Sequence, residues 1–122
     1  MPLYKLTLDP IPSYADYEDS FAFKDAGNAA VDLTGFGSQW VLGIGKGRAT
    51  TRSDYAVLLT QANKDLIISN PVNGIIKVQY TPEKLAPLTP DNDYQIDLWY
   101  TKNNRKGAWG YGTIRLLGPG GG

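Results

Sequence analysis

The sequence of 122 residues contains no cysteine and no histidine. Without cysteine the chain can form no disulfide, has no thiol nucleophile and offers no thiolate to zinc. Without histidine it lacks the commonest general base and the commonest metal ligand of proteins. Most of the usual catalytic and metal-binding arrangements are therefore excluded, and we expect a protein that is not an enzyme and needs no cofactor.

An excess of charge of one sign is also missing, because 12 lysines and arginines balance 12 aspartates and glutamates. Nucleic-acid binders normally carry a basic excess or a basic stripe. The one short basic cluster, at residues 102–106, is interpreted as a solvated turn at the tip of a hairpin. We therefore expect no nucleic-acid partner.

Long apolar runs are absent as well. No segment approaches the length of a membrane span, and residues 1–5 lack the apolar stretch of a signal peptide. The sequence therefore predicts a protein made in a cytoplasm, with no membrane partner.

Glycine and proline are frequent and spread along the chain, and short segments of alternating apolar and polar residues lie between them. Such alternation is typical of short strands joined by turns. Strands are expected near residues 4–8, 21–24, 40–44, 55–60, 66–69, 74–80, 94–101 and 108–117. One helical turn is expected at residues 81–85, because Thr81 can cap it and Pro82 suits its first position.

Seven or eight short strands predict an all-β fold, an immunoglobulin-like two-sheet β-sandwich. A closed barrel is the alternative. Residues 1–117 are expected to form this single domain and residues 118–122 a flexible glycine-rich tail. The alternation predicts a core of Phe21, Phe23, Trp40, Leu42, Ile76, Val78, Tyr80, Ile96 and Leu98.

Three segments suggest a ligand at first sight. The glycines at residues 43–47 lack the phosphate-loop pattern and are interpreted as a strand end. Asp91, Asp93 and Asp97 have a spacing that suggests calcium, but turn chemistry explains the first two, and we expect no metal. The acidic and aromatic residues 14–19 are either a docking segment or, as we favour, a solvated connection between strands.

The order of several motifs resembles a known family. The sequence V-D-L-T-G at residues 31–35 follows an alternating strand with a D-A-G turn and precedes another strand around Trp40. The remaining similar segments are residues 19–23, 73–78, 81–88 and 93–98. This set resembles a small immunoglobulin-like domain of tailed-phage virion proteins, such as the N-terminal domain of the baseplate upper protein.

The resemblance implies a structural protein of a tailed bacteriophage particle, located in the virion, within the baseplate, tail, collar, head fibres or capsid decoration. It further implies that the partners are other virion proteins and that the chain forms a homo-oligomer, with a trimer as one option. The alternative is a carbohydrate-binding module that attaches the particle to host glycans. For the V-D-L-T-G segment we expect a structural role, with Asp32 bonded to nearby backbone and Gly35 at a positive φ.

The last hairpin supplies the candidate interface. If Trp99 faces Trp109, then Leu98 lies opposite Gly110, Asp97 opposite Tyr111 and Ile96 opposite Gly112. This register places Trp99, Trp109 and Tyr111 together on the outer face of the sheet. Three aromatic residues there predict a protein interface, a sugar-stacking platform, or a surface covered by a loop of the same chain.

Overall fold

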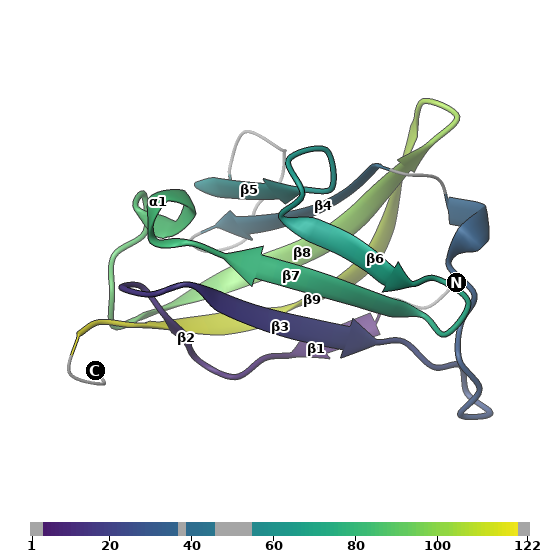
Figure 1. Cartoon of the computed structure of the whole chain (residues 1–122), viewed down its shortest axis with the longest axis horizontal. Helices are drawn as coiled ribbons and strands as arrows, with labels where there is room; N and C mark the ends of the chain where they lie inside the picture. The colour runs from purple at the N-terminus through teal and green to yellow at the C-terminus, as the bar shows by residue number, and fades with distance from the viewer. Residues whose placement is uncertain (1–3, 37–38, 46–54, 120–122) are drawn as a thin grey trace.

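The computed structural model describes residues 4–36, 39–45 and 55–119 (Figure 1). Within these ranges the chain forms nine strands and two short helical turns. The helical turns are the 3-10 turn η1 (Thr34–Phe36) and α1 (Pro82–Leu85). The strands are β1 (Tyr4–Thr7), β2 (Ile11–Pro12), β3 (Tyr17–Ala22), β4 (Gln39–Gly45), β5 (Val57–Thr60), β6 (Leu66–Asn70), β7 (Ile75–Tyr80), β8 (Asn92–Lys102) and β9 (Arg105–Leu117).

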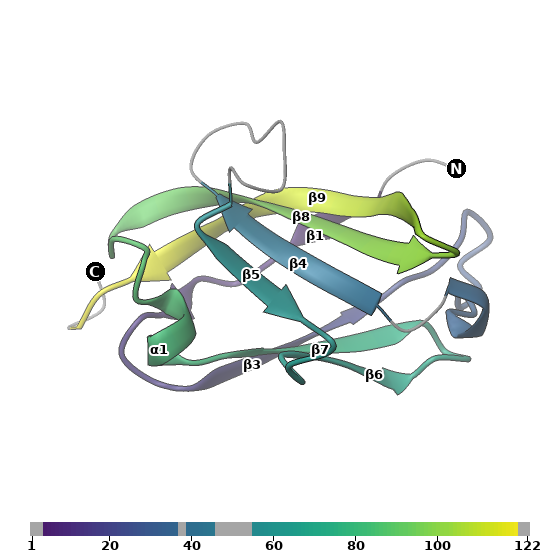
Figure 2. The same ribbon diagram turned by 90° about the horizontal axis from the view of Figure 1, so that it is seen from above.

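The strands form two sheets, which Figure 2 shows as two layers. The larger sheet has the order β1-β9-β8-β4-β5, with β2 also paired to β9, and the smaller sheet has the order β3-β7-β6. The predicted all-β two-sheet sandwich is therefore confirmed. None of the helical turns in the described ranges is long and apolar enough to cross a membrane.

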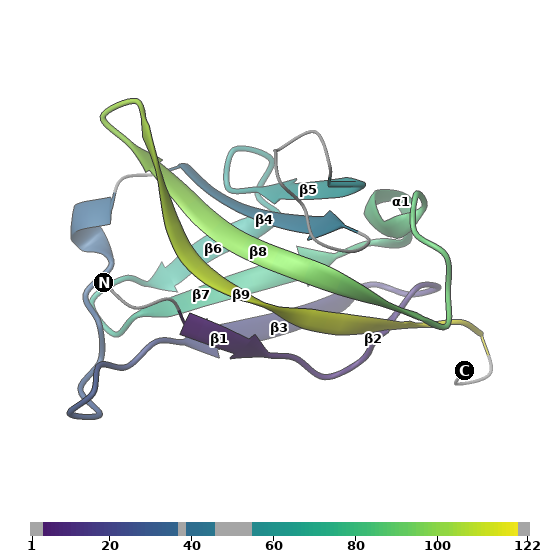
Figure 3. The ribbon, with the colours of Figure 1, turned by 180° about the vertical axis from the view of Figure 1, so that it is seen from behind.

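The strand β2 is not predicted by the alternation of the sequence. The first predicted strand was expected to end at residues 9–12, where two prolines occur. Instead Ile11 and Pro12 pair in parallel with Leu116 and Leu117 of β9, along the same edge as β1 (Figure 3). Pro12 is tolerated because an edge strand needs no donor on its free side. Ile11 is fully buried, which explains why the chain returns to the sheet.

The strand order agrees with the immunoglobulin pattern, in which strands B, E and D form one sheet and G, F and C the other. The order β3-β7-β6 corresponds to B-E-D, and β9-β8-β4 corresponds to G-F-C. β5 extends the second sheet beyond C, as in variable-type domains. The first strand pairs with β9 on this same sheet.

Two residues reproduce side-chain features of that fold. Trp40, on the strand equivalent to C, is fully buried between the sheets. Tyr94, near the start of β8, forms the equivalent of a tyrosine corner: its hydroxyl accepts a hydrogen bond from the Thr89 N–H (2.7 Å) and donates to the Thr89 carbonyl (3.2 Å). These two bonds tie β8 to the connection that leaves α1.

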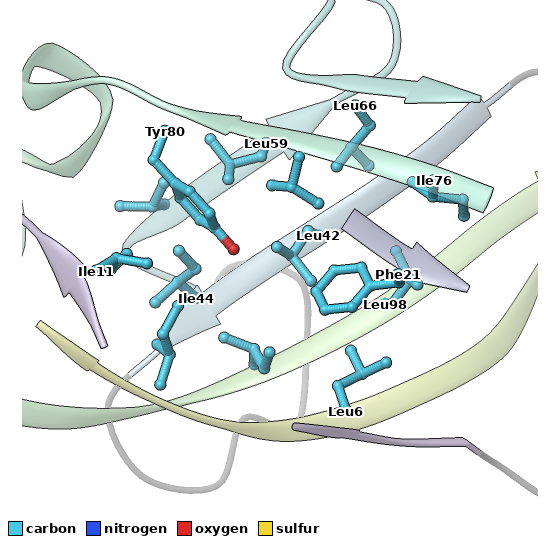
Figure 4. Packing of buried hydrophobic residues seen from close by; sticks show 14 of the residues in the cluster. Leu6, Ile11, Phe21, Leu42, Ile44, Leu59, Leu66, Ile76, Tyr80 and Leu98 are labelled. Carbon is cyan, nitrogen blue, oxygen red and sulfur yellow. The ribbon is translucent and has the colours of Figure 1, made fainter. Parts of the chain in front are cut away.

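The space between the sheets is filled by apolar side chains from both layers (Figure 4). All nine predicted core residues are buried, so that prediction is confirmed. The Tyr80 hydroxyl points into this space, and no hydrogen-bond partner for it is found in the described structure. Burial of the hydroxyl raises the pKa of Tyr80 far above its ordinary value.

The predicted helical turn is also confirmed. The Thr81 hydroxyl oxygen accepts a hydrogen bond from the Lys84 N–H (3.3 Å), and Pro82 occupies the first turn. Leu85 at the end of α1 is buried, so the turn closes one end of the sandwich with an apolar side chain.

Replacing Trp40 with alanine should lower the free energy of unfolding by about 3–5 kcal/mol, because it removes a fully buried indole from between the sheets. Urea denaturation of purified protein measures the change. Val72→Ala is the control, since Val72 is 61% exposed and should cost less than about 0.5 kcal/mol. A loss below about 1 kcal/mol for Trp40→Ala would contradict its central place in the core.

Tyr94→Phe should cost about 1–3 kcal/mol, because both bonds to Thr89 are lost while the ring stays in place. Tyr111→Phe is the matched control, since the side chain of Tyr111 is exposed and no hydrogen bond of its hydroxyl is found in the described structure. Equal stability of the two variants in denaturant melts would show that the corner contributes nothing.

Candidate interaction face

The outer face of the larger sheet is the side turned away from β3, β7 and β6. Successive residues of a strand point to opposite faces. Tyr94, Ile96 and Leu98 of β8 belong to the core, so the residues that alternate with them point outward. On β8 these are Asp93, Gln95, Asp97 and Trp99, and on β9 they include Tyr111, Thr113 and Arg115.

Most of the predicted hairpin register is confirmed. Leu98 pairs with Gly110, Asp97 with Tyr111 and Ile96 with Gly112. The large side chain opposite position 112 is one reason for a glycine there, and the neighbouring strand gives a second. A Cβ there would collide with the backbone carbonyl of Leu6, because β1 lies close against β9 at this point.

The predicted pairing of Trp99 with Trp109 is wrong. The register shifts after Leu98, so that Trp99 pairs with Ala108 and Trp109 becomes the extra residue of a β-bulge. A bulge re-aims a side chain, and here it turns Trp109 inward, where only 1% of its surface is exposed. The placement of Trp109 on the outer face is therefore wrong, and it cannot form part of the predicted interface.

Aromatic contacts explain why Trp109 turns inward. Its ring lies 4.8 Å from that of Phe36, 5.2 Å from Tyr4 and 5.3 Å from Trp40, measured between centroids. Phe23 also packs against it edge-on, at 5.6 Å. Edge-to-face contacts of this kind stabilise a pair beyond the area that it buries. The alternation of β9 alone could not reveal this, because the partners come from β1, β4, η1 and the residue after β3.

Trp99 does point outward, but residues of the same chain cover it. Its ring lies 5.1 Å from the Tyr55 ring, and the Lys106 ammonium lies 4.2 Å from its centroid. The Tyr55 hydroxyl donates a hydrogen bond of 2.6 Å to Asp97, which holds Tyr55 over the sheet. Only 3% of Trp99 is exposed, so covering by the same chain, one of the three expectations for this face, holds at this residue.

Tyr111 is the predicted interface residue that remains accessible, with 42% of its surface exposed. It stands between Lys5 of β1 and Asp97 of β8, its cross-strand neighbours. A partly apolar ring is thus flanked by a cation on one side and an anion on the other. We call Lys5, Tyr111, Asp97 and their neighbours Gln95 and Thr113 the Tyr111 face.

A shallow depression of about 320 Å³ lies beside the Tyr111 face. It is lined by Tyr55, Asp97, Leu98, Trp99, Lys106, Ala108 and Gly110. Because Asp97 belongs both to this depression and to the Tyr111 face, a partner on Tyr111 could place a side chain in it.

The three aspartates considered for calcium do not converge. Asp93 forms an ion pair with Arg115 (3.3 Å), Asp97 accepts from Tyr55, and Asp91 accepts from the Gly118 N–H (3.4 Å). Calcium needs six to eight oxygens around one point. In the part of the chain that the structure describes, no group of three or more candidate ligands could hold a metal ion.

The glycine-rich segment ends β4 as expected, since the strand runs to Gly45, while residues 46 and 47 lie outside the described ranges. At Gly43 a Cβ would come within 2.7 Å of the Tyr55 ring and 2.9 Å of the Trp99 ring. This glycine therefore makes room for the aromatic layer that covers the outer face, a role unrelated to phosphate binding.

In the V-D-L-T-G segment one expectation is confirmed and one is wrong. Asp32 accepts hydrogen bonds from the Thr34 N–H (2.9 Å) and from the Thr34 hydroxyl (2.7 Å), as expected of a structural turn. Gly35 does not have a positive φ, because the chain continues into the right-handed turn η1. A Cβ at Gly35 would meet no atom within 4 Å.

Comparison of the chain with models of protein families, with curated proteins and with solved structures found no match.

The two hydrogen bonds from Thr34, the side-chain bond first, lower the pKa of the Asp32 carboxyl below its ordinary value. Thr34→Val removes the side-chain bond and should raise the Asp32 pKa toward that value. Because the folded-state pKa is the lowered one, the bond stabilises the protein at neutral pH, and this contribution is lost as the pH falls through the folded-state pKa. An NMR titration of the side-chain carboxyls measures the shift. An unchanged Asp32 midpoint in Thr34→Val would contradict this assignment.

Proposed function

We propose that the protein is a structural component of a tailed-phage particle and acts there as an assembly module that binds other virion proteins through the Tyr111 face. The observation that carries this proposal is an exposed tyrosine on β9, an inner strand of the larger sheet, between a lysine and an aspartate on the two neighbouring strands. The proposal also rests on the resemblance of the motif order to immunoglobulin-like virion domains.

The chemistry of the Tyr111 face suits a protein partner. Tyrosine is enriched in protein interfaces, because its ring buries a large area and its hydroxyl can still bond. Lys5 and Asp97 on either side would fix the orientation of a partner that carries the opposite pair of charges. The backbone of Tyr111 is paired with both neighbouring strands, so it does not have to be ordered on binding.

The carbohydrate alternative has less support from the geometry. A sugar platform needs aromatic rings with open faces, but Trp109 is in the core and Trp99 is covered by Tyr55 and Lys106. Tyr111 alone would have to stack the sugar. We therefore favour assembly in the virion, as a symmetric homo-oligomer or with other structural proteins, and without catalysis.

Tyr111→Ser should reduce incorporation of the protein into purified particles at least tenfold, because the central side chain of the interface is lost. Quantitative mass spectrometry of the particles measures the copy number. Val72→Ser is the matched control, since Val72 is also exposed but lies on the turn between β6 and β7, and it should leave incorporation unchanged. Circular dichroism should show the same fold for both variants.

Two results would contradict the proposal. Normal copy number of Tyr111→Ser would show that this face is not the virion interface. Normal incorporation combined with loss of glycan binding would instead support the carbohydrate-binding alternative.

A further inference from the structure

The hairpin between β8 and β9 projects beyond the rest of the sandwich and ends in three cations (Figure 1). Lys102, Arg105 and Lys106 surround a two-residue turn, Asn103-Asn104. Both asparagines have positive φ values, 53° and 62°, which identifies the mirror-image turn that suits the twist of a hairpin. The three cations, here called the basic tip, are therefore held on a defined turn at the end of two long strands.

The arrangement within the basic tip is electrostatically unfavourable. Lys102 and Arg105 are directly opposite each other in the register, and like charges in that position destabilise a hairpin. Neither has a carboxylate partner within the described residues. The tip also borders a hollow of about 400 Å³, lined by Tyr100, Lys102, Asn103, Arg105, Lys106 and Gly107. An anionic partner would relieve the repulsion.

A complementary surface lies at the opposite end of the same molecule. Asp16 precedes β3 and Glu18 is the second residue of that strand; both line one hollow, and we call these two residues the acidic end. In all three ribbon views the start of β3 and the basic tip are at opposite ends of the long axis (Figures 1–3). Glu18 is paired with Lys77 (3.4 Å), whereas Asp16 has no cation partner within the described structure.

The acidic end also borders a hollow and one half-buried tyrosine, Tyr17. A hollow of about 290 Å³ there is lined by Asp16, Tyr17, Glu18, Gln79, Tyr80 and Thr81. Tyr14, close by in the chain, is 54% exposed. A carboxylate near a half-buried ring such as Tyr17 suits a guanidinium or ammonium group, which can form an ion pair and a cation–π contact together.

We propose that the basic tip of one copy binds the acidic end of a second copy, so that the chain associates with itself head to tail. The two ends carry opposite charge on a molecule whose net charge is zero, so overall repulsion does not oppose the contact. Such a contact joins two different surfaces and therefore produces a ring or an open row of copies. It deepens the proposed assembly role but uses neither Tyr111 nor the face around it.

Sedimentation velocity at several protein concentrations tests the contact. At an ionic strength of about 0.01 M, where charges act over about 30 Å, the wild-type protein should form faster-sedimenting species, and at about 1 M these should disappear. Each of two charge-reversed variants, Lys102→Glu with Arg105→Glu and Asp16→Lys with Glu18→Lys, should remain monomeric at low salt. An equal mixture of the two should associate again, because each reversed end then meets a complementary one.

The controls separate this contact from net charge and from the Tyr111 face. Lys24→Glu with Lys64→Glu changes the net charge as much as the tip variant does and should leave association intact, as should Tyr111→Ser. A wild type that is monomeric at low salt, or a mixture that fails to associate although both variants are folded, would overturn the proposal. So would tip-dependent binding of heparin by a protein that stays monomeric, which would point to a polyanion partner.

Discussion

Apolar packing between the inner faces of the two sheets is what the rest of this structure depends on. The chain has no cysteine, so no disulfide can join the sheets. Trp40 is fully buried in that packing, beside two rings of its own sheet, Trp109 and Tyr100, at 5.3 and 5.4 Å between centroids. Large rings bury much area for little loss of rotamer freedom, which suits them to hold two sheets without a covalent link.

This demand for aromatic contacts also shapes the candidate surface. Turning Trp109 into the core requires a bulge in β9, and the bulge shifts the register so that Trp99 pairs with Ala108. Trp99 is then covered by Tyr55 and Lys106, and Tyr111 remains as the accessible aromatic residue of the hairpin. The interaction face is therefore smaller than the sequence suggested, and a binding role there depends on one ring and its charged neighbours.

The net charge of zero does not show how the charged residues are distributed along the molecule. The chain as a whole has no net charge, yet the fold places the basic tip and the acidic end at opposite ends of the long axis. In the sequence each segment looks like a solvated turn or connection. In the structure the tip is a defined hairpin turn with two like charges directly opposite each other. A negatively charged surface bound there would reduce the repulsion between them.

The sequence by itself determined the all-β class, the nine core residues that we named from it and the capped turn at Thr81, because alternation and capping are local signals. It also determined the hairpin register from Ile96 to Leu98, where glycines face large side chains. The choice of a two-sheet sandwich over a closed barrel was decided by strand pairing. Only the tertiary structure decided the strand at Ile11, the inward turn of Trp109 and the right-handed turn at Gly35. Each depends on contacts with residues distant in the chain or on the space left when the elements pack together. A local sequence pattern contains no information about either.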